Sequence, residues 1–359
     1  MIYGTYLGGP TNDKATAIAV DSAGNLYVTG STGGSFPTTP SAAIPASTSS
    51  TFFAAKLSAD GSRFLYSTYL PDSMSQAWAI TADVQGNAYV AGNTKDGHAY
   101  ITKLSPDGSA FLYTKLLSGS GQEVASAVAV DAAGNLVAAG ETSSTDFPIT
   151  SSALQKTLAG AQNAFVAKLD AAGNIVYSTY LGGSGKESCN AVRIDSAGKI
   201  YVAGLTTSPD FPATTGTFQP TPVVPLWSQG DGPSSQFFSG FIAKLSAGGS
   251  SPDYASYVMS KDGVTSLAVN ASGEAYLAGT TLAGFPVTAS APQPCYGGED
   301  DVFVAHLDSR GGLLDATYFG GSQNDTPLGL ALAGDGSILL AAGIGGEPVL
   351  AQLRFGGPG

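Results

Sequence analysis

Apolar and polar residues alternate along this chain in short runs, each stopped by Gly, Asp, Ser or Pro. The stretch 175–205, followed by 241–245, contains four such runs. Runs of this length with turn residues at both ends are typical of β-strands, whose side chains alternate between two faces. The pattern therefore predicts an all-β protein.

The same pattern of four runs repeats six times along the chain. A repeat of roughly 60 residues with four strands is the signature of a β-propeller blade. One such unit cannot cover both faces of its own sheet, so neighbouring units must do so. Residues 1–359 are therefore predicted to form a single six-bladed β-propeller domain, with four antiparallel strands in each blade.

Within each repeat we name the strands A to D in chain order. Strand A is rich in small residues, which suits the crowded axis of a propeller, and a turn such as 21–25 follows it. The chain begins with a D strand at residues 2–7 and finishes with A, B and C strands within 328–353. We therefore predict that the N-terminal strand completes the last blade, which removes the strand edges that an open array exposes.

Composition narrows the set of partners. The formal net charge is −12 and the basic residues are dispersed, so neither nucleic acid nor an anionic membrane surface is expected to bind. No apolar run is long enough to span a bilayer, and no signal peptide precedes the first strand. The Ser/Thr-rich, Lys-poor composition favours an extracellular or cell-surface monomer whose signal peptide has been removed, over a cytosolic protein.

The repeated motifs YSTYLGG, AVDSAGN and FVAKL, together with an FP-x-T segment, resemble the SBBP repeats of bacterial β-propeller proteins over essentially the whole chain. The resemblance implies a propeller fold and an extracellular or cell-surface setting, and it supplies no chemistry. The family name refers to seven blades, whereas six repeats are present here. The second and sixth repeats also lack FP-x-T. In the other four we expect its phenylalanine to fill the gap between neighbouring blades: Phe36, Phe147, Phe211 and Phe285.

A column of acidic residues precedes strand A. If the D–A and B–C loops share one end of the propeller, these residues occupy equivalent points on a loop-bearing face. The carboxylates could together bind Ca²⁺ or a cationic ligand, or each could accept hydrogen bonds from its own loop. The six positions, each eight residues before the turn, are Asp13, Ser75, Glu123, Glu187, Asp262 and Asp325.

Departures from the repeat mark a candidate ligand site on the blade 4 side of this face. Arg193 stands where other repeats have Ala or Thr, and Trp78 and Asn190 depart from the usual start of strand A. The B–C loop of blade 4 is longer than the others and contains Trp227. Arg offers a planar fork for a carboxylate or sugar hydroxyls, and Trp offers a flat apolar wall. In the alternative, Arg193 pairs with an acid such as Glu187 and the insertion packs on its own blade.

No catalytic motif is found, and the GGSG at 182–185 opens a strand rather than the helix of a phosphate loop. His98 and His306 lie on or beside C strands and are expected to be neither general bases nor metal ligands. Cys189 and Cys295 lie on the same face of adjacent blades. They would form a disulfide if their Cα atoms came within about 7 Å, or else remain two unpaired thiols.

Three classes of function remain. The first is a secreted or cell-surface binding or scaffold module that presents its loop-bearing face to a glycan, peptide or partner protein. The second is a hydrolase or lyase that acts at the channel mouth with an acidic, Ca²⁺-binding rim. The third is a purely structural repeat module of a larger surface protein. The poor catalytic inventory weighs against the second, and the blade 4 insertion weighs against the third.

Overall fold

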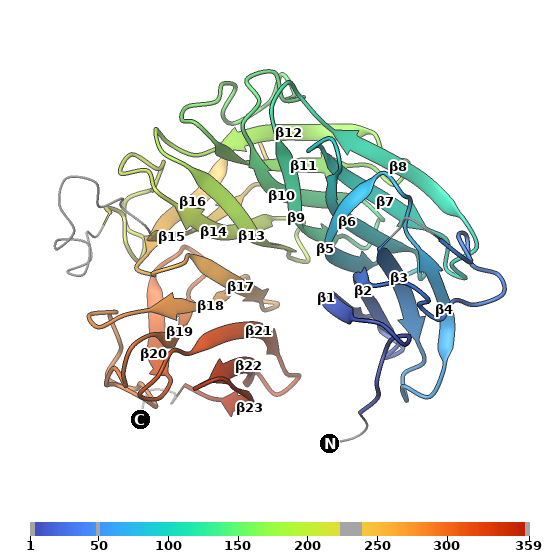
Figure 1. Cartoon of the computed structure of the whole chain (residues 1–359). Helices are drawn as coiled ribbons and strands as arrows, with labels where there is room; N and C mark the ends of the chain where they lie inside the picture. The colour runs from blue at the N-terminus through green and yellow to red at the C-terminus, as the bar shows by residue number, and fades with distance from the viewer. Residues whose placement is uncertain (1–3, 48–50, 223–238, 356–359) are drawn as a thin grey trace. The chain divides into compact units, whose positions relative to one another are not determined.

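The structure of the protein is a computed structural model that describes residues 4–47, 51–222 and 239–355. These residues form 23 β-strands and no helix (Figure 1). Nothing in this described part is a helix long and apolar enough to cross a membrane. Trp227 and the segment around it lie outside the described residues.

The strands form six sheets, which we number as blades in chain order. Blade 1 contains β1 (Asp13–Val20), β2 (Leu26–Thr32), β3 (Phe52–Leu57) and β4 (Phe64–Tyr69). Blade 2 contains β5 (Met74–Ala82), β6 (Ala88–Thr94), β7 (Ala99–Leu104) and β8 (Phe111–Leu117). Blade 3 contains β9 (Glu123–Val130), β10 (Leu136–Thr142), β11 (Asn163–Leu169) and β12 (Ile175–Leu181).

The second half repeats the arrangement. Blade 4 contains β13 (Glu187–Ile194), β14 (Ile200–Thr206), β15 (Ser239–Leu245) and β16 (Pro252–Val258). Blade 5 contains β17 (Val264–Val269), β18 (Ala275–Thr281), β19 (Asp301–Leu307) and β20 (Leu313–Phe319). Blade 6 contains β21 (Thr326–Leu332), β22 (Ile338–Ile344) and β23 (Glu347–Leu353).

The predicted fold class is confirmed: the chain is an all-β protein with the six blades of a β-propeller. In every blade the strands pair antiparallel with their chain neighbours in the order A, B, C, D. Among the described residues the last sheet holds three strands, and residues 4–12 form no strand. The pairing of residues 2–7 with β23 stays a prediction, because residues 1–3 lie outside the described part and the two ends belong to different compact units.

The chain divides into two compact units, and each is described here by itself. One holds Met1–Ser151 and Val166–Ser178, and the other holds Ser152–Phe165 and Thr179–Gly359. In the first, Tyr27 and Ala54 of blade 1 pack in one buried cluster with Ile80 and Val90 of blade 2. In the second, blades 4 and 5 share a larger cluster that includes Ile242 and Leu277. The core therefore lies between successive blades, as expected for units that cannot bury their own faces.

In blades 1, 2 and 4 a turn aspartate, a strand B tyrosine and a strand C lysine lie together beside the A–B turn. In blade 1, Asp21 accepts hydrogen bonds from the backbone N–H of Ala23 (3.0 Å) and Asn25 (2.9 Å). The Tyr27 hydroxyl donates to Asp21 over 3.2 Å, and Lys56 Nζ lies 3.5 Å from the same carboxylate and 4.7 Å from the centre of the tyrosine ring. The motif explains why the repeat carries Asp in the turn, Tyr in strand B and Lys in strand C.

The FP-x-T phenylalanines are buried, but mainly within their own blades. Phe36 stacks on Phe53 of strand C with ring centres 3.9 Å apart, and its backbone N–H donates to the Tyr69 hydroxyl. Phe285 repeats both contacts with Phe303 and Tyr318. The motif folds the B–C loop back onto its own sheet, so it is a packing element, as expected. Phe285 also belongs to the cluster shared by blades 4 and 5, with its ring centre 6.3 Å from that of Phe218 of blade 4, so here the phenylalanine packs between neighbouring blades as well.

Candidate functional site

The acidic column falls where strand A begins, closer to the sheet than the sequence indicated. Glu123 and Glu187 are the first residues of β9 and β13 and pair in register with Thr142 and Thr206. The strands start early because a register shift, such as the one between Cys189 and Ala191, lets the ladder continue past the small-residue run. The register also places the start of strand A and the end of strand B at one end of the blade.

Glu187 is buried and saturated with hydrogen bonds. One carboxylate oxygen accepts from the hydroxyls of Thr206 (2.7 Å) and Ser208. The other accepts from Asn163 Nδ2 (2.8 Å) and from the Gly183 backbone N–H (3.1 Å). Burial raises the pKa of Glu187, although these donors oppose the shift. The carboxylate ties the start of strand C in blade 3 to the first strand of blade 4.

Glu123 repeats this arrangement in the other unit with a different donor. It accepts from Thr142 (3.1 Å), from Ser144, and from the Gly119 backbone N–H (3.3 Å). His98 takes the place of the asparagine, with Nδ1 at 3.0 Å from the carboxylate. His98 therefore takes part in holding the buried Glu123 carboxylate, and the expectation that it is not a general base stays a prediction.

The remaining column positions differ from these two. Asp325 is buried and accepts from the backbone N–H groups of Gly321 (2.6 Å) and Gly345 (2.8 Å). Asp13 is half-buried and accepts from the Gly9 backbone N–H over 2.7 Å. Asp262 is exposed, and Ser75 lies inside β5. These contacts match the loop-capping interpretation of the column, and joint binding of a cation by the column stays a prediction.

The residues that depart from the repeat each have a different hydrogen-bond partner. Trp78 in β5 is 43% exposed, and its Nε1 donates to Asn93 Oδ1 over 3.0 Å. Asn190 in β13 donates to the Val264 carbonyl of blade 5 over 3.1 Å, so it links two blades. Arg193 is exposed and its Nη1 donates to the Val192 carbonyl over 2.8 Å, while Glu187 is occupied by other donors. A ligand role for Trp78, Asn190 and Arg193 stays a prediction.

Among the described residues, no group of three or more His, Cys, Asp or Glu side chains is placed to hold a metal ion. Cys189 is buried and Cys295 is exposed, and the two do not form a disulfide with each other. His306 stacks on Tyr276 with ring centres 4.1 Å apart, and its Nε2 lies 3.2 Å from Glu274. Both rings and the carboxylate belong to blade 5, so His306 packs within its own blade.

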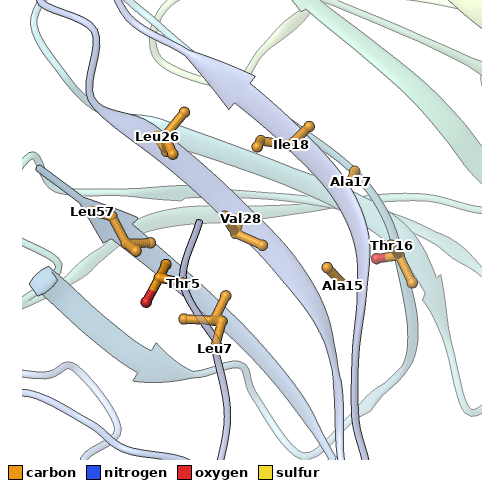
Figure 2. Close-up of a pocket in the computed structure, with 9 residues that line it drawn as sticks. All are labelled: Thr5, Leu7, Ala15, Thr16, Ala17, Ile18, Leu26, Val28 and Leu57. Atoms are coloured by element: carbon orange, nitrogen blue, oxygen red, sulfur yellow. The ribbon is translucent and has the colours of Figure 1, made fainter. Parts of the chain in front are cut away.

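Each of the two units has a cavity lined by described residues. The first, of about 400 Å³, lies on the outer face of blade 1. Figure 2 shows Ile18, Leu26 and Val28 along it, with Leu7 of the N-terminal segment packed against the cluster that contains Val28 and Leu57. This face corresponds to the one that blade 2 packs against blade 1, so the cavity lies on a face of the kind that meets the preceding blade.

The second cavity, of about 360 Å³, lies in the other unit beside blades 3 and 4. Leu154 and Gln155 of the blade 3 B–C loop line it, with Leu181 at the end of β12 and Leu245 of β15. Asp210 lies at its edge and accepts from the Ser184 backbone N–H and hydroxyl, each over 2.8 Å. These hydrogen bonds lower the pKa of Asp210, so a negative charge borders an apolar hollow.

Sequence reasoning missed the donors that surround the buried acids. The clearest signal was available: blades 3 and 4 carry Thr-x-Ser at the end of strand B, Thr142 with Ser144 and Thr206 with Ser208, where blade 5 has Thr281 followed by Leu282. The donor at the start of strand C, Asn163, gave no signal, because it sits far from the acid in sequence and meets it only through the packing of one blade on the next.

Comparisons with known proteins agree with the fold. The SBBP β-propeller repeat family matches residues 2–37 and 176–212. Each matched segment ends in the FP sequence, after covering the D, A and B strand sequences of one repeat. No curated protein matches the chain at a significant level.

Several solved structures are similar at low identity. A chain of the mitotic checkpoint complex has 12% identity and a TM-score of 0.53, over 95% of this chain and 74% of that one. A catalytically inactive virginiamycin B lyase from Staphylococcus aureus, solved with quinupristin, has 10% identity and a TM-score of 0.47, over 98% and 87%. The Dos1 propeller has 10% identity and a TM-score of 0.47, over 94% and 77%. At these identities the likeness concerns the fold alone.

Proposed function

Because the chain is a six-bladed β-propeller that carries SBBP-type repeats, we propose that it is a binding module that takes an apolar side chain of a peptide or protein partner. The cavity beside blades 3 and 4 carries this proposal. Its walls are leucine and alanine side chains from strands and loops that are otherwise held by hydrogen bonds, so the hollow is formed before a ligand arrives.

The edge of the cavity favours a partner with a basic residue next to the apolar one. Asp210 is held ionised there by Ser184, and the whole chain has a formal net charge of −12. Gln155 is committed to the fold, since its side chain donates to Asn163 Oδ1 (2.9 Å) and accepts from the Gly182 backbone N–H (2.9 Å). The partner would therefore be recognised by shape and by one charge rather than by a wide polar network.

The test is a displayed peptide library selected against the whole chain, followed by measurement of Kd for the selected peptides. Leu154→Asp places a charge in the apolar wall and should weaken binding by more than about tenfold. Leu314→Asp is the matched control, because Leu314 is exposed on β20, outside the cavity. Selected peptides that bind both variants like the wild type would contradict the cavity as the binding site.

The same peptides can test the site that the sequence predicted from Arg193 and Trp227, two residues that depart from the repeat. Arg193→Ala and Trp227→Ala should both retain wild-type affinity if the cavity binds the peptide. A loss of more than about tenfold in both, at unchanged melting temperature, would move the proposed site to the Arg193 side of blade 4.

We also propose that the module works outside the cell or at its surface. The support is the composition and the setting that SBBP repeats imply. Protease treatment of intact producing cells should degrade the protein, whereas a cytosolic marker survives. Protection equal to that of the marker would contradict an outside location.

A further inference from the structure

One polar unit recurs at the junction between blades, and blade 3 to blade 4 shows it in full. Gln155 Nε2 donates to Asn163 Oδ1 over 2.9 Å, and the Ala159 backbone N–H donates to the same oxygen over 2.8 Å. Asn163 Nδ2 in turn donates to Glu187 Oε2 over 2.8 Å. The asparagine amide is thus oriented with its oxygen towards donors and its nitrogen towards acceptors.

The junction of blades 5 and 6 is built on the same plan. Gln293 Nε2 and the Gly297 backbone N–H approach Asp301 Oδ2 at 3.4 and 2.8 Å. The backbone matches too: the Gly321 N–H donates to Asp325 as the Gly183 N–H donates to Glu187. Asp301 therefore occupies the place of Asn163, and Asp325 that of Glu187.

Because an aspartate stands at this junction where the other has an asparagine, one carboxylate oxygen of Asp301 has no hydrogen-bond partner. Asp301 Oδ2 takes the role of the asparagine oxygen, so Oδ1 takes the place of the donating nitrogen. Asp301 is fully buried, and its Oδ1 has no hydrogen-bond partner. A buried carboxylate oxygen with no donor is costly, so something positive or protic is required at this point.

The surroundings of that oxygen are themselves acceptors. Asn163 Nδ2 donates to the carbonyls of Gln162 (3.1 Å) and Gly183 (3.2 Å) as well as to Glu187. The equivalent carbonyls at this junction are those of Asp300 and Gly321, and we expect them near Asp301 Oδ1; the Asp300 carbonyl accepts from the Asp325 backbone N–H over 2.8 Å. A Cβ on Gly320 would lie 2.8 Å from Asp301 Oδ1 and would clash with Asp325 Oδ2, so the glycine is needed where the two carboxylates meet.

We propose that Asp301 and Asp325 bind one hard divalent cation of the Ca²⁺ type between blades 5 and 6. A shared proton could bridge only two of the oxygen atoms at this junction. A divalent cation can be bound by several of them at once. Two carboxylates and neutral main-chain oxygens suit a hard cation rather than a thiolate- or imidazole-seeking metal. The neighbouring Lys261 does not supply the positive charge for Asp301, because its Nζ binds the Asp300 carboxylate at 2.7 and 2.9 Å. The site is independent of the peptide cavity.

Ca²⁺ is the probe, added to the EDTA-treated and dialysed full chain. At about one hundred times its Kd it should raise the melting temperature by roughly 3–4 °C, since it binds only the folded state. Isothermal titration at pH 7 should show one ion per chain. A flat melting temperature, with no heat of binding, would overturn the proposal.

The decisive variant is Asp301→Asn, which restores the amide found at Asn163. It should abolish the Ca²⁺ shift and, in EDTA, melt above the wild type, because Nδ2 can donate to Asp325. Asp300→Asn is the matched control and should keep the full Ca²⁺ shift, since Asp300 offers its carbonyl rather than its carboxylate to the site. A full shift in Asp301→Asn would place the ion elsewhere and overturn the assignment.

A shared proton makes a different prediction. In that case Ca²⁺ would leave the wild type unchanged, while lowering the pH from 7 to 5 in EDTA would raise its melting temperature relative to Asp301→Asn. That result would replace the cation with a carboxyl–carboxylate hydrogen bond. The reciprocal variant Asn163→Asp should create a second Ca²⁺-dependent junction beside Glu187, and its failure to respond would contradict the proposed role of the acid pair.

Discussion

Strands A and B of blades 1 and 2 have similar sequences, yet an equivalent isoleucine is buried in one blade and exposed in the other. Ile80 in β5 is 6% exposed because it packs against blade 1, whereas Ile18, at the same place in β1, is 63% exposed. In blade 6, Leu350 of β23 is 88% exposed, while its counterpart Val304 in blade 5 is buried. The repeat marks which faces are apolar, but a neighbouring blade is needed to bury them.

The strongest way to break this comparison is to remove the segment expected to cover the last sheet. Deletion of residues 1–9 should lower the free energy of unfolding by several kcal/mol or cause aggregation, because we propose that residues 2–7 pair with β23. Thermal melting and light scattering of the truncated chain are the measurements. An unchanged melting temperature would refute closure of the propeller by the N-terminal strand.

The acidic column also contains a buried residue, Glu187, and an exposed one, Asp262, at equivalent positions. Glu187→Ala should cost about 3–5 kcal/mol, because it leaves buried donors such as Asn163 Nδ2 unsatisfied, whereas Asp262→Ala should cost less than about 0.5 kcal/mol. Denaturant unfolding measures both. Equal losses would mean that burial does not decide the role of the column.

The raised pKa of Glu187 adds a pH dependence to that experiment. A carboxyl whose folded pKa is raised stabilises the fold most below its unfolded pKa, and that contribution is lost as pH rises through the folded pKa. Unfolding measured from pH 4 to 8 should therefore show this decline in the wild type and less of it in Glu187→Ala. The same decline in both proteins would assign it to another group.

A smaller effect is expected from the isoleucines themselves. Ile80→Ala should cost about 2–4 kcal/mol, as a truncation in a packed core does. If closure covers blade 1, Ile18→Ala should cost at least half as much. A loss below about 0.5 kcal/mol for Ile18→Ala would show that this face stays open in solution.

The smallest effect should be equal in the two blades, because it depends on local contacts alone. Asp60 and Asp107 occupy matching C–D turns, and hydrogen bonds from Ser58 and Ser105 hold the pKa of each at about 2. A lowered pKa stabilises the fold above the unfolded value near 3.8, and this gain is lost as pH falls through 2. Asp60→Asn and Asp107→Asn should each lower the melting temperature slightly at pH 6, with the difference vanishing near pH 2. Unequal shifts would mean that the turns also depend on their blades.

The sequence predicted where the candidate residues lie along the strands but not which side chains surround them. The register that sets Glu187 opposite Thr206 follows from counting back from the turn, so its place at the end of the blade was predictable. Its partner Asn163 was not, because hydrogen bonding between them requires two blades to pack. Arg193 stood out as an exception to the repeat. Its guanidinium donates to the carbonyl of Val192, and a departure in sequence did not reveal which side chains lie near it.

Periodicity, turn chemistry and repetition determined the strands, their order within a blade and the number of blades, because these depend on residues close together in the chain. Which equivalent side chains are buried was decided only by tertiary packing. Asp262 and Asp325 hold the same place in the repeat, but one is exposed while the other is enclosed by glycine backbone and by Asp301 of the preceding blade. The need for a positive charge beside these two carboxylates comes from the packing of one blade on the next. A pattern read along the sequence does not contain that packing.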